Sequence, residues 1–225
     1  PILVNEILTH TDLPQRDAVE LHNPTGADVD LSGWWLTDDA ATPAKYRIPI
    51  GTLLPAGGYI LFDETQFNTG TDGNVPFAFS SLGEDVYLFS ATTNGQLTGY
   101  NHGFAFGAAF NNVSFGRYVN SVGEELFPAQ TEMSLGAPNP GPRVGPIVLN
   151  EIHYHPAGAE DEEFIELLNT SDETVAFFDL EYPTNTWIFR GIGYSFPAGI
   201  TLGPAELLLL GRSEAHTSEL QSRQV

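Results

Sequence analysis

The chain of 225 residues is 41% hydrophobic, and it is long enough for one large domain or two modest ones. Its 29 acidic residues outweigh 8 Lys and Arg to give a net charge of −21, which disfavours direct binding to nucleic acid or to an anionic membrane surface. The absence of cysteine excludes disulfides and thiolate metal sites, and no run approaches the roughly 18 apolar residues of a membrane-spanning helix.

Short apolar runs separated by Gly, Pro and Asn predict β-strands along the first part of the chain. Alternation within a run places one face of a strand in a core, as with Val19 and Leu21 on either side of Glu20. Asn94-Gly95 indicates a hairpin turn. The predicted strands are 2–8, 17–22, 29–36, 46–50, 59–62, 76–79, 86–89, 97–100 and 113–118, with loops at 63–74 and 104–110.

The beginning of the chain recurs in part further along. Asn5-Glu6-Ile7 matches Asn150-Glu151-Ile152, and the Glu-Leu-x-Asn sequence of 20–23 returns at 166–169. Between the copies, prolines and glycines crowd a stretch that prevents both helix and strand pairing, so it is predicted to be a linker. Strands of the second copy are predicted from residue 147 and then at 164–168, 175–180, 186–189, 194–196 and 206–210.

Many short strands and no sustained helical periodicity before residue 205 favour an all-β protein built of β-sandwiches. The predicted arrangement is tandem: a first sandwich at 1–133, the linker at 134–145 and an incomplete second sandwich at 146–211. The stretch 212–225 resembles the translation of a sequencing-library adapter. We therefore expect a non-native tail and a second module that was cut short.

Several motifs of the first module together resemble a known family. They are Val4-Asn-Glu-Ile7, Val19-Glu-Leu-His-Asn-Pro24, Asp30-Leu-Ser-Gly-Trp34-Trp-Leu-Thr-Asp38 and Pro55-Ala-Gly-Gly-Tyr59. With them, residues 1–140 resemble the bacterial type of lamin-tail domain, and the part after residue 146 is similar to a truncated second copy. The resemblance implies immunoglobulin-like β-sandwiches that serve as accessory modules of large exported or cell-surface proteins. It supplies no catalytic motif.

Two Asn residues at equivalent places are predicted to be structural. Asn23 and Asn169 each end a strand and begin a turn, where an Asn side chain can bond backbone amides two residues on.

Two Glu residues, Glu20 and Glu166, precede these turns by three positions. With Glu6 and Glu151 they could form carboxylate pairs of the kind that glycosidases use. The favoured interpretation is again structural, with each carboxylate at a strand edge accepting bonds from turn amides, because an enzyme site would also need a cleft.

Glu151, His153 and His155 form the most site-like group in the sequence. They alternate along one strand, so their side chains share a face, and two His with a carboxylate can bind zinc or iron. The favoured interpretation is a solvent-facing polar edge, because the first module has no matching triplet. The metal site is kept as a minor hypothesis, and with it a metal-dependent hydrolase fragment as the weakest alternative function.

Ligand binding has two further candidates. Trp34 and Trp35 are adjacent and must point to opposite faces, so Trp35 could present its ring to a sugar. The acidic stretches 63–72 and 159–163 could hold calcium through oxygen ligands, although neither has the spacing of a dedicated calcium loop. No other cofactor is expected.

The sequence therefore predicts a non-enzymatic module of a larger exported or cell-surface bacterial protein. Its expected roles are adhesion, scaffolding or targeting of a neighbouring domain. The expected partners are other domains of the parent protein, other proteins or surface glycans. The alternative is a carbohydrate- or calcium-dependent binding module.

Overall fold

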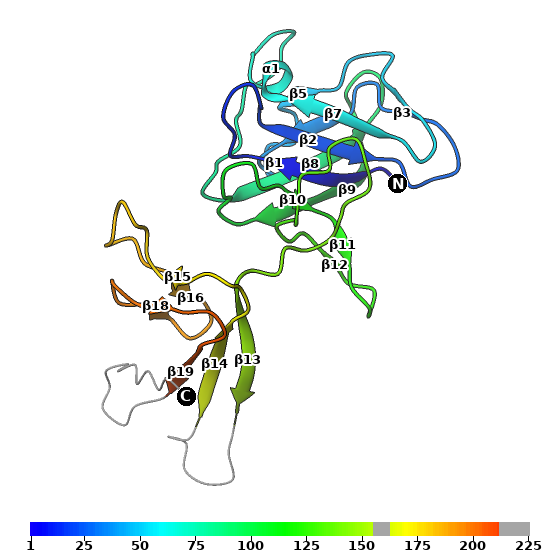
Figure 1. The fold of residues 1–225 in the computed structure, drawn as a ribbon. Helices are drawn as coiled ribbons and strands as arrows, with labels where there is room; N and C mark the ends of the chain where they lie inside the picture. The colour runs from blue at the N-terminus through cyan, green and yellow to red at the C-terminus, as the bar shows by residue number, and fades with distance from the viewer. Residues whose placement is uncertain (155–162, 212–225) are drawn as a thin grey trace. The chain divides into compact units, whose positions relative to one another are not determined.

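The computed structural model describes residues 1–154 and 163–211, and the chain divides into two compact units, Pro1–Arg143 and Val144–Val225 (Figure 1). Within the described residues, no helix is long and apolar enough to cross a membrane.

The first unit has a four-stranded antiparallel sheet in the order β10-β1-β2-β7, made of β1 (Leu3–Leu8), β2 (Ala18–His22), β7 (Tyr59–Asp63) and β10 (Phe115–Gly116). The predicted alternation holds in β2, where Val19 and Leu21 enter the core and Glu20 points to the opposite face. A β-bulge lies in β1 between Val4 and Glu6, so Asn5 is an extra residue against β2.

A second antiparallel sheet has the order β5-β4-β8-β9. Its strands are β4 (Trp35–Thr37), β5 (Tyr46–Arg47), β8 (Glu84–Ala91) and β9 (Leu97–Phe106). The predicted Asn94-Gly95 hairpin is confirmed, because β8 and β9 pair across it and Gly95 has a positive φ of 82°. Two short pairs complete the unit, β3 (Val29–Asp30) with β6 (Leu53–Leu54) and β11 (Tyr118–Val119) with β12 (Glu125–Leu126).

Side chains from both sheets share one buried core, so the first unit is a β-sandwich. The fully buried members include Val4, Ile7, Leu21, Leu36 and Leu88. The predicted all-β fold class is confirmed.

The region after β7 differs from the prediction. A short helix, α1 (Glu64–Phe67), begins in the expected loop, because Asp63 and Gln66 form a capping box. The expected strand 76–79 is absent from this described region. Phe77 and Phe79 instead pack their rings against Phe67, with centroids 4.9 and 5.3 Å from that ring.

The second unit repeats part of this architecture. Its main antiparallel sheet consists of β13 (Ile147–His153), β14 (Phe164–Asn169) and β19 (Leu207–Gly211). Two short strand pairs accompany it, β15 (Val175–Ala176) with β18 (Thr201–Leu202) and β16 (Ile188–Phe189) with β17 (Tyr194–Ser195). Its small core includes Leu167, Phe177 and Leu208.

The second unit covers one face of β13 less completely than the first unit covers β1. Val4 and Ile7 of β1 are 0% exposed, whereas the matching Leu149 and Ile152 are 54% and 62% exposed. In the first unit these residues share a core with side chains of β8 and β9, and β10 pairs with β1 at the edge of the same sheet. Within its described residues, the second unit has no counterpart of those three strands.

The boundary between the units, Arg143 to Val144, lies inside the predicted linker 134–145. The first part of that stretch does not act as a linker. Ser134 and Gly136 donate hydrogen bonds to side chains of β1 and β2, so the first domain extends beyond residue 133. The predicted non-native tail, 212–225, lies outside the described residues.

Candidate functional site

Two carboxylates lie side by side on the outer face of the first sheet. Glu6 of β1 and Glu20 of β2 are paired at their Cα atoms, directly after the bulge, and both side chains are 0% exposed. Burial of two acidic groups is costly unless each oxygen receives a hydrogen bond. The donors that surround this acid pair therefore decide what it can do.

All four carboxylate oxygens of the acid pair accept hydrogen bonds from the chain itself. The Ser134 backbone N–H donates to Glu6 Oε1 at 2.9 Å, and Ser134 Oγ donates to Glu6 Oε2 at 2.7 Å. Asn5 Nδ2 donates to Glu20 Oε1 at 2.8 Å, and the Gly136 backbone N–H donates to Glu20 Oε2. The segment Ser134 to Asn139, called the capping segment below, thus closes over the acid pair.

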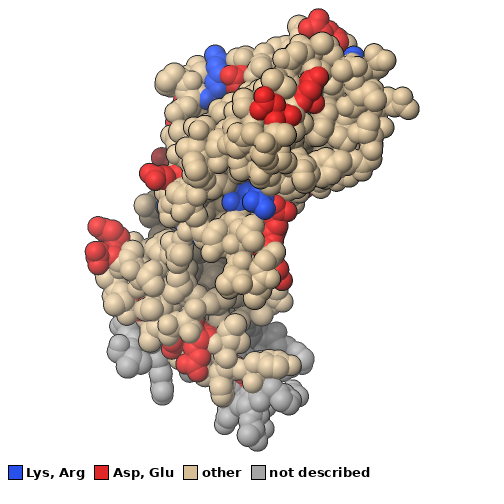
Figure 2. Space-filling view, turned by 90° about the vertical axis from the view of Figure 1, so that its right-hand side faces the viewer, with Lys and Arg blue, Asp and Glu red and all other residues tan. Residues whose placement is uncertain are grey.

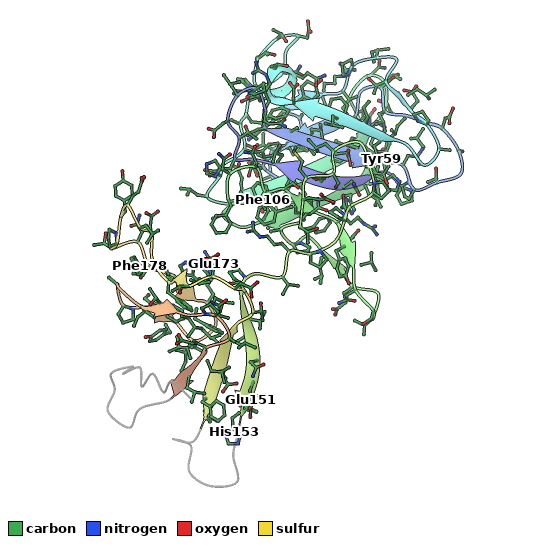
Figure 3. The ribbon with its side chains drawn as sticks, in the orientation of Figure 1. Tyr59, Phe106, Glu151, His153, Glu173 and Phe178 are labelled. Carbon is green, nitrogen blue, oxygen red and sulfur yellow. The ribbon has the colours of Figure 1, made fainter. Side chains whose placement is uncertain are left out.

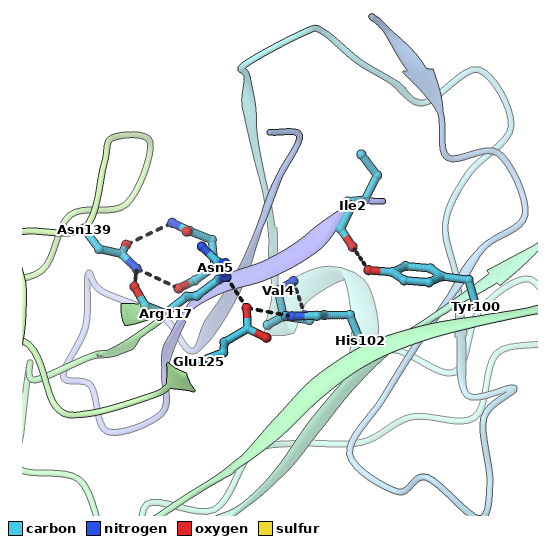
Figure 4. A network of polar contacts seen from close by, with 8 residues as sticks. All are labelled: Ile2, Val4, Asn5, Tyr100, His102, Arg117, Glu125 and Asn139. Atoms are coloured by element: carbon cyan, nitrogen blue, oxygen red, sulfur yellow. Dashed lines mark hydrogen bonds and ion pairs between the residues drawn. The ribbon is translucent and has the colours of Figure 1, made fainter. Parts of the chain in front are cut away.

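Asn139 fixes the end of the capping segment. Its Nδ2 donates to the carbonyl oxygens of Asn5 and Arg117 at 3.0 and 2.9 Å, and its Oδ1 accepts from Asn5 Nδ2 at 2.9 Å (Figure 4). Asn5 therefore donates its two amide hydrogens to Glu20 and Asn139. The bulge that makes Asn5 an extra residue also lets it reach both groups.

Burial raises the pKa of Glu20 from its ordinary 4.5 to about 7. The hydrogen bonds from Gly136 and Asn5 oppose this rise, and the neighbouring Glu6 charge adds to it. A carboxyl group with a pKa near neutrality is typical of a general acid. Here, however, the group is fully buried and already bonded on both oxygens, so it has no free position to offer a substrate.

A second polar group, which the sequence interpretation missed, joins β1 to β9. His102 Nδ1 accepts from the backbone N–H of Val4 at 2.9 Å, so its proton is on Nε2, which faces Glu125 Oε1 at 3.3 Å (Figure 4). Burial lowers the pKa of His102, Glu125 opposes this effect and Arg117 adds to it. Arg117 also forms an ion pair with Glu125. β9 continues through Phe104 and Phe106, which were predicted to lie in a loop. Their alternation places His102 on the same inward face, and this was the available signal for it.

The two turn residues make the same set of bonds in both units. Asn23 and Asn169 are 0% exposed, and the Nδ2 of each donates to three backbone carbonyl oxygens within 2.7–3.0 Å. The acceptors are Ala27, Leu54 and Pro55 in the first unit and Glu173, Leu202 and Gly203 in the second. Each Asn Oδ1 accepts from the residue two positions on, Thr25 or Ser171. Each Asn side chain therefore joins its own turn to a second chain segment, residues 54–55 in the first unit and 202–203 in the second.

The second unit has its own acid pair. Glu151 of β13 and Glu166 of β14 are Cα partners directly after a bulge, and Asn150 Nδ2 donates to Glu166 Oε1 at 2.6 Å. Glu151 is exposed and Glu166 is half-buried. Neither Glu20 nor Glu166 accepts from the amides of its own turn, because each side chain points across its sheet toward the bulged Asn.

The metal hypothesis stays a prediction. Figure 3 labels Glu151 and His153 near the end of β13, where the His153 ring lies 5.0 Å from that of Phe164. The third predicted ligand, His155, lies outside the described residues. Among the residues that the structure describes, no three His, Asp or Glu are grouped to hold a metal ion.

The other residues predicted to contact a ligand, Trp35 and the acidic stretch 63–72, already form contacts within the first unit. Trp35 is half-buried, its Nε1 donates to the Gly95 carbonyl oxygen at 2.8 Å, and the Arg47 guanidinium lies 5.9 Å from its ring. Trp34 packs against the core. In the stretch 63–72, Asp63 is used as the cap of α1, and 159–163 falls almost wholly outside the described residues. Calcium binding stays a prediction.

Comparison with known proteins identifies the first unit. Residues 1–102 match the family model of the Lamin Tail Domain. The first unit carries a lamin tail domain. Neither the curated proteins nor the solved structures gave a match.

Lamin tail domains are non-enzymatic and immunoglobulin-like, so the predicted fold class agrees with the family. The matched range ends at His102, before β10 and the capping segment. The acid pair of the first unit is thus closed by residues that lie beyond the matched range. Membership of the second unit in the family stays a prediction.

Replacement of Asn23 tests the junction between its turn and residues 54–55. In Asn23→Ala, three backbone carbonyl groups lose their donor, so we expect the first unit to lose about 3 kcal/mol of unfolding free energy. Chemical denaturation measures the loss. Asn101→Ala, at an exposed position of β9, is the matched control and should stay within about 0.5 kcal/mol of wild type. Equal stability of the two variants would contradict the proposed junction.

Replacement of Glu20 tests the electrostatics of the acid pair. Because the pKa of Glu20 is raised to about 7 in the fold, its contribution to stability is complete below about pH 4.5 and is lost as the pH rises through about 7. We expect the unfolding free energy to fall less steeply over this range in Glu20→Gln than in wild type. Urea titrations followed by NMR signals of β1 and β2 measure both slopes. The exposed variant Glu132→Gln should keep the wild-type slope, and an unchanged slope in Glu20→Gln would refute the assignment.

Proposed function

We propose that this chain is a non-catalytic module of a larger exported or cell-surface bacterial protein. In this role it holds partners together, attaches to a surface or targets a neighbouring domain. Its partners are other domains of the parent protein, other proteins or surface glycans. The family match supports the general statement in this proposal, that the first unit is a β-sandwich of a protein-interaction type.

The observation that carries the proposal is the closed state of the acid pair. Glu6 and Glu20 form the most enzyme-like group of the first unit, yet every carboxylate oxygen is bonded by the chain itself. The group therefore stabilises the sandwich, which leaves the surface of the module for binding.

The charge of the surface limits the kind of partner. Figure 2 shows Asp and Glu scattered over one face of the chain, with few Lys or Arg among them. With a net charge of −21, the chain repels phosphate backbones and anionic lipids. Neutral or basic protein surfaces and uncharged glycans remain compatible with it.

One set of binding assays separates the proposal from its alternatives. The immobilised chain is offered exported bacterial proteins and a glycan array, each with calcium and with EDTA, and the free chain is screened for hydrolase activity. We expect protein capture that survives EDTA and disappears when the chain is heat-unfolded, with no turnover. Glycan binding that needs calcium and is lost in Trp35→Ala would instead support the carbohydrate-binding alternative. Turnover that needs zinc would support the hydrolase.

A further inference from the structure

The start of β1 is held on one side by side chains and not by a strand. β2 pairs with β1 along its whole length apart from the bulge, whereas β10 pairs only with residues 6–7. Backbone groups before residue 6 that are not bonded to β2 therefore need other partners. Two side chains of β9 supply them: Tyr100 Oη donates to the Ile2 carbonyl oxygen at 2.7 Å, and His102 Nδ1 accepts from the Val4 N–H at 2.9 Å (Figure 4).

The two bonds respond differently to acid. A Tyr hydroxyl donates at any pH below its pKa, which burial raises above the ordinary 10.0 in Tyr100, so acid leaves the bond to Ile2 intact. An imidazole nitrogen accepts only while it carries no proton. Protonation of His102 at Nδ1 places one N–H donor against another, so the bond from Val4 is lost.

Charged groups from two other segments face the His102 ring. Glu125 Oε1 of β12 lies 3.3 Å from Nε2, and Arg117, between β10 and β11, forms an ion pair with that same oxygen. β1 contributes the Val4 N–H, and the Phe127 ring packs edge-on with its centroid 6.0 Å away. Burial lowers the pKa of His102 below the ordinary 6.5, Glu125 opposes this effect and Arg117 adds to it. Because Arg117 already bonds the facing oxygen, a protonated ring gains less from Glu125 than it would from a free carboxylate.

We propose that His102 is an acid-sensitive latch, which holds the start of β1 against β9 while its ring is neutral and releases the Val4 N–H when its ring is protonated. The release is local. Residues 6–7 keep their strand pairing with β10, and Ile2 keeps its bond from Tyr100. The latch is a regulatory contact within the first unit, goes beyond the proposed binding role and does not depend on any partner.

The sign of the pH effect distinguishes the latch from the acid pair. Because the pKa of His102 is lowered in the fold, the contribution of the neutral ring to stability is complete above about pH 6.5 and declines as the pH falls below that value. The contribution of Glu20 has the opposite sign and is complete below about pH 4.5. Acid therefore loosens the start of β1 while the centre of the same strand pair keeps its support.

The test follows the Val4 amide of the full ¹⁵N-labelled chain by NMR between about pH 8 and about pH 5, where His titrates. The N–H···N bond gives a ¹⁵N–¹⁵N coupling between Val4 and His102 Nδ1, and the ring ¹⁵N shifts report the protonation of His102. We expect the coupling to disappear, and the hydrogen-exchange protection of the Val4 amide to fall about tenfold, as His102 titrates. The Ile7 amide, in the part of β1 with a strand on each side, should keep its protection.

Two variants separate the latch from general effects of acid. His102→Gln removes the titrating ring, so the protection of the Val4 amide should no longer depend on pH in this range. His10→Gln, at an exposed site of the same unit, is the matched control and should keep the wild-type pH dependence. The same spectra check that each variant is folded, and the wild-type titration tests the latch without either variant.

Four results would overturn the latch. The first is a His102 ring that stays neutral down to about pH 5. The second is a Val4 amide whose protection stays constant while His102 titrates. The third is the same pH dependence in His102→Gln as in wild type. The fourth is a pH dependence that follows the ring signals of His22, whose pKa is also lowered by burial.

Discussion

Burial of two neighbouring carboxylates is the constraint on which the first unit depends. Glu6 and Glu20 can be buried together only because four hydrogen bonds reach their oxygens. Three of the four come from Ser134 and Gly136, more than 100 positions away along the chain. The first strand pair and the end of the first unit therefore stabilise each other.

The two units show which parts of this arrangement form locally. The Asn turn, the bulge and the bond from the bulged Asn occur in both units, in the second one without a counterpart of β8, β9 and β10 among the described residues. These features use contacts among the few strands that both units share. The closed acid pair occurs where the capping segment is also present. Strands and turns alone therefore form the bulge and the Asn turn, and the distant capping segment then closes the acid pair.

The strand pattern and the turn at Asn23 were predictable, because alternation and turn chemistry act over a few residues. The pairing of Glu6 with Glu20 was anticipated as a possibility from neighbouring strands. The donors were not, because the local sequence of 134–142, rich in Pro and Gly, is typical of a linker, and its partners are distant in sequence. His102 was missed for a related reason: glycine and small residues beside Phe104 suggested a loop, whereas cross-strand pairing with β8 extends β9 to Phe106.

The capping segment and the acid pair stabilise each other directly. A double-mutant cycle of Ser134→Ala and Glu6→Gln, measured by chemical denaturation of the full chain, tests it, because Ser134 Oγ donates to Glu6 at 2.7 Å. We expect a coupling free energy of at least about 1 kcal/mol between the two changes. Additive effects, with a coupling within about 0.3 kcal/mol of zero, would contradict it.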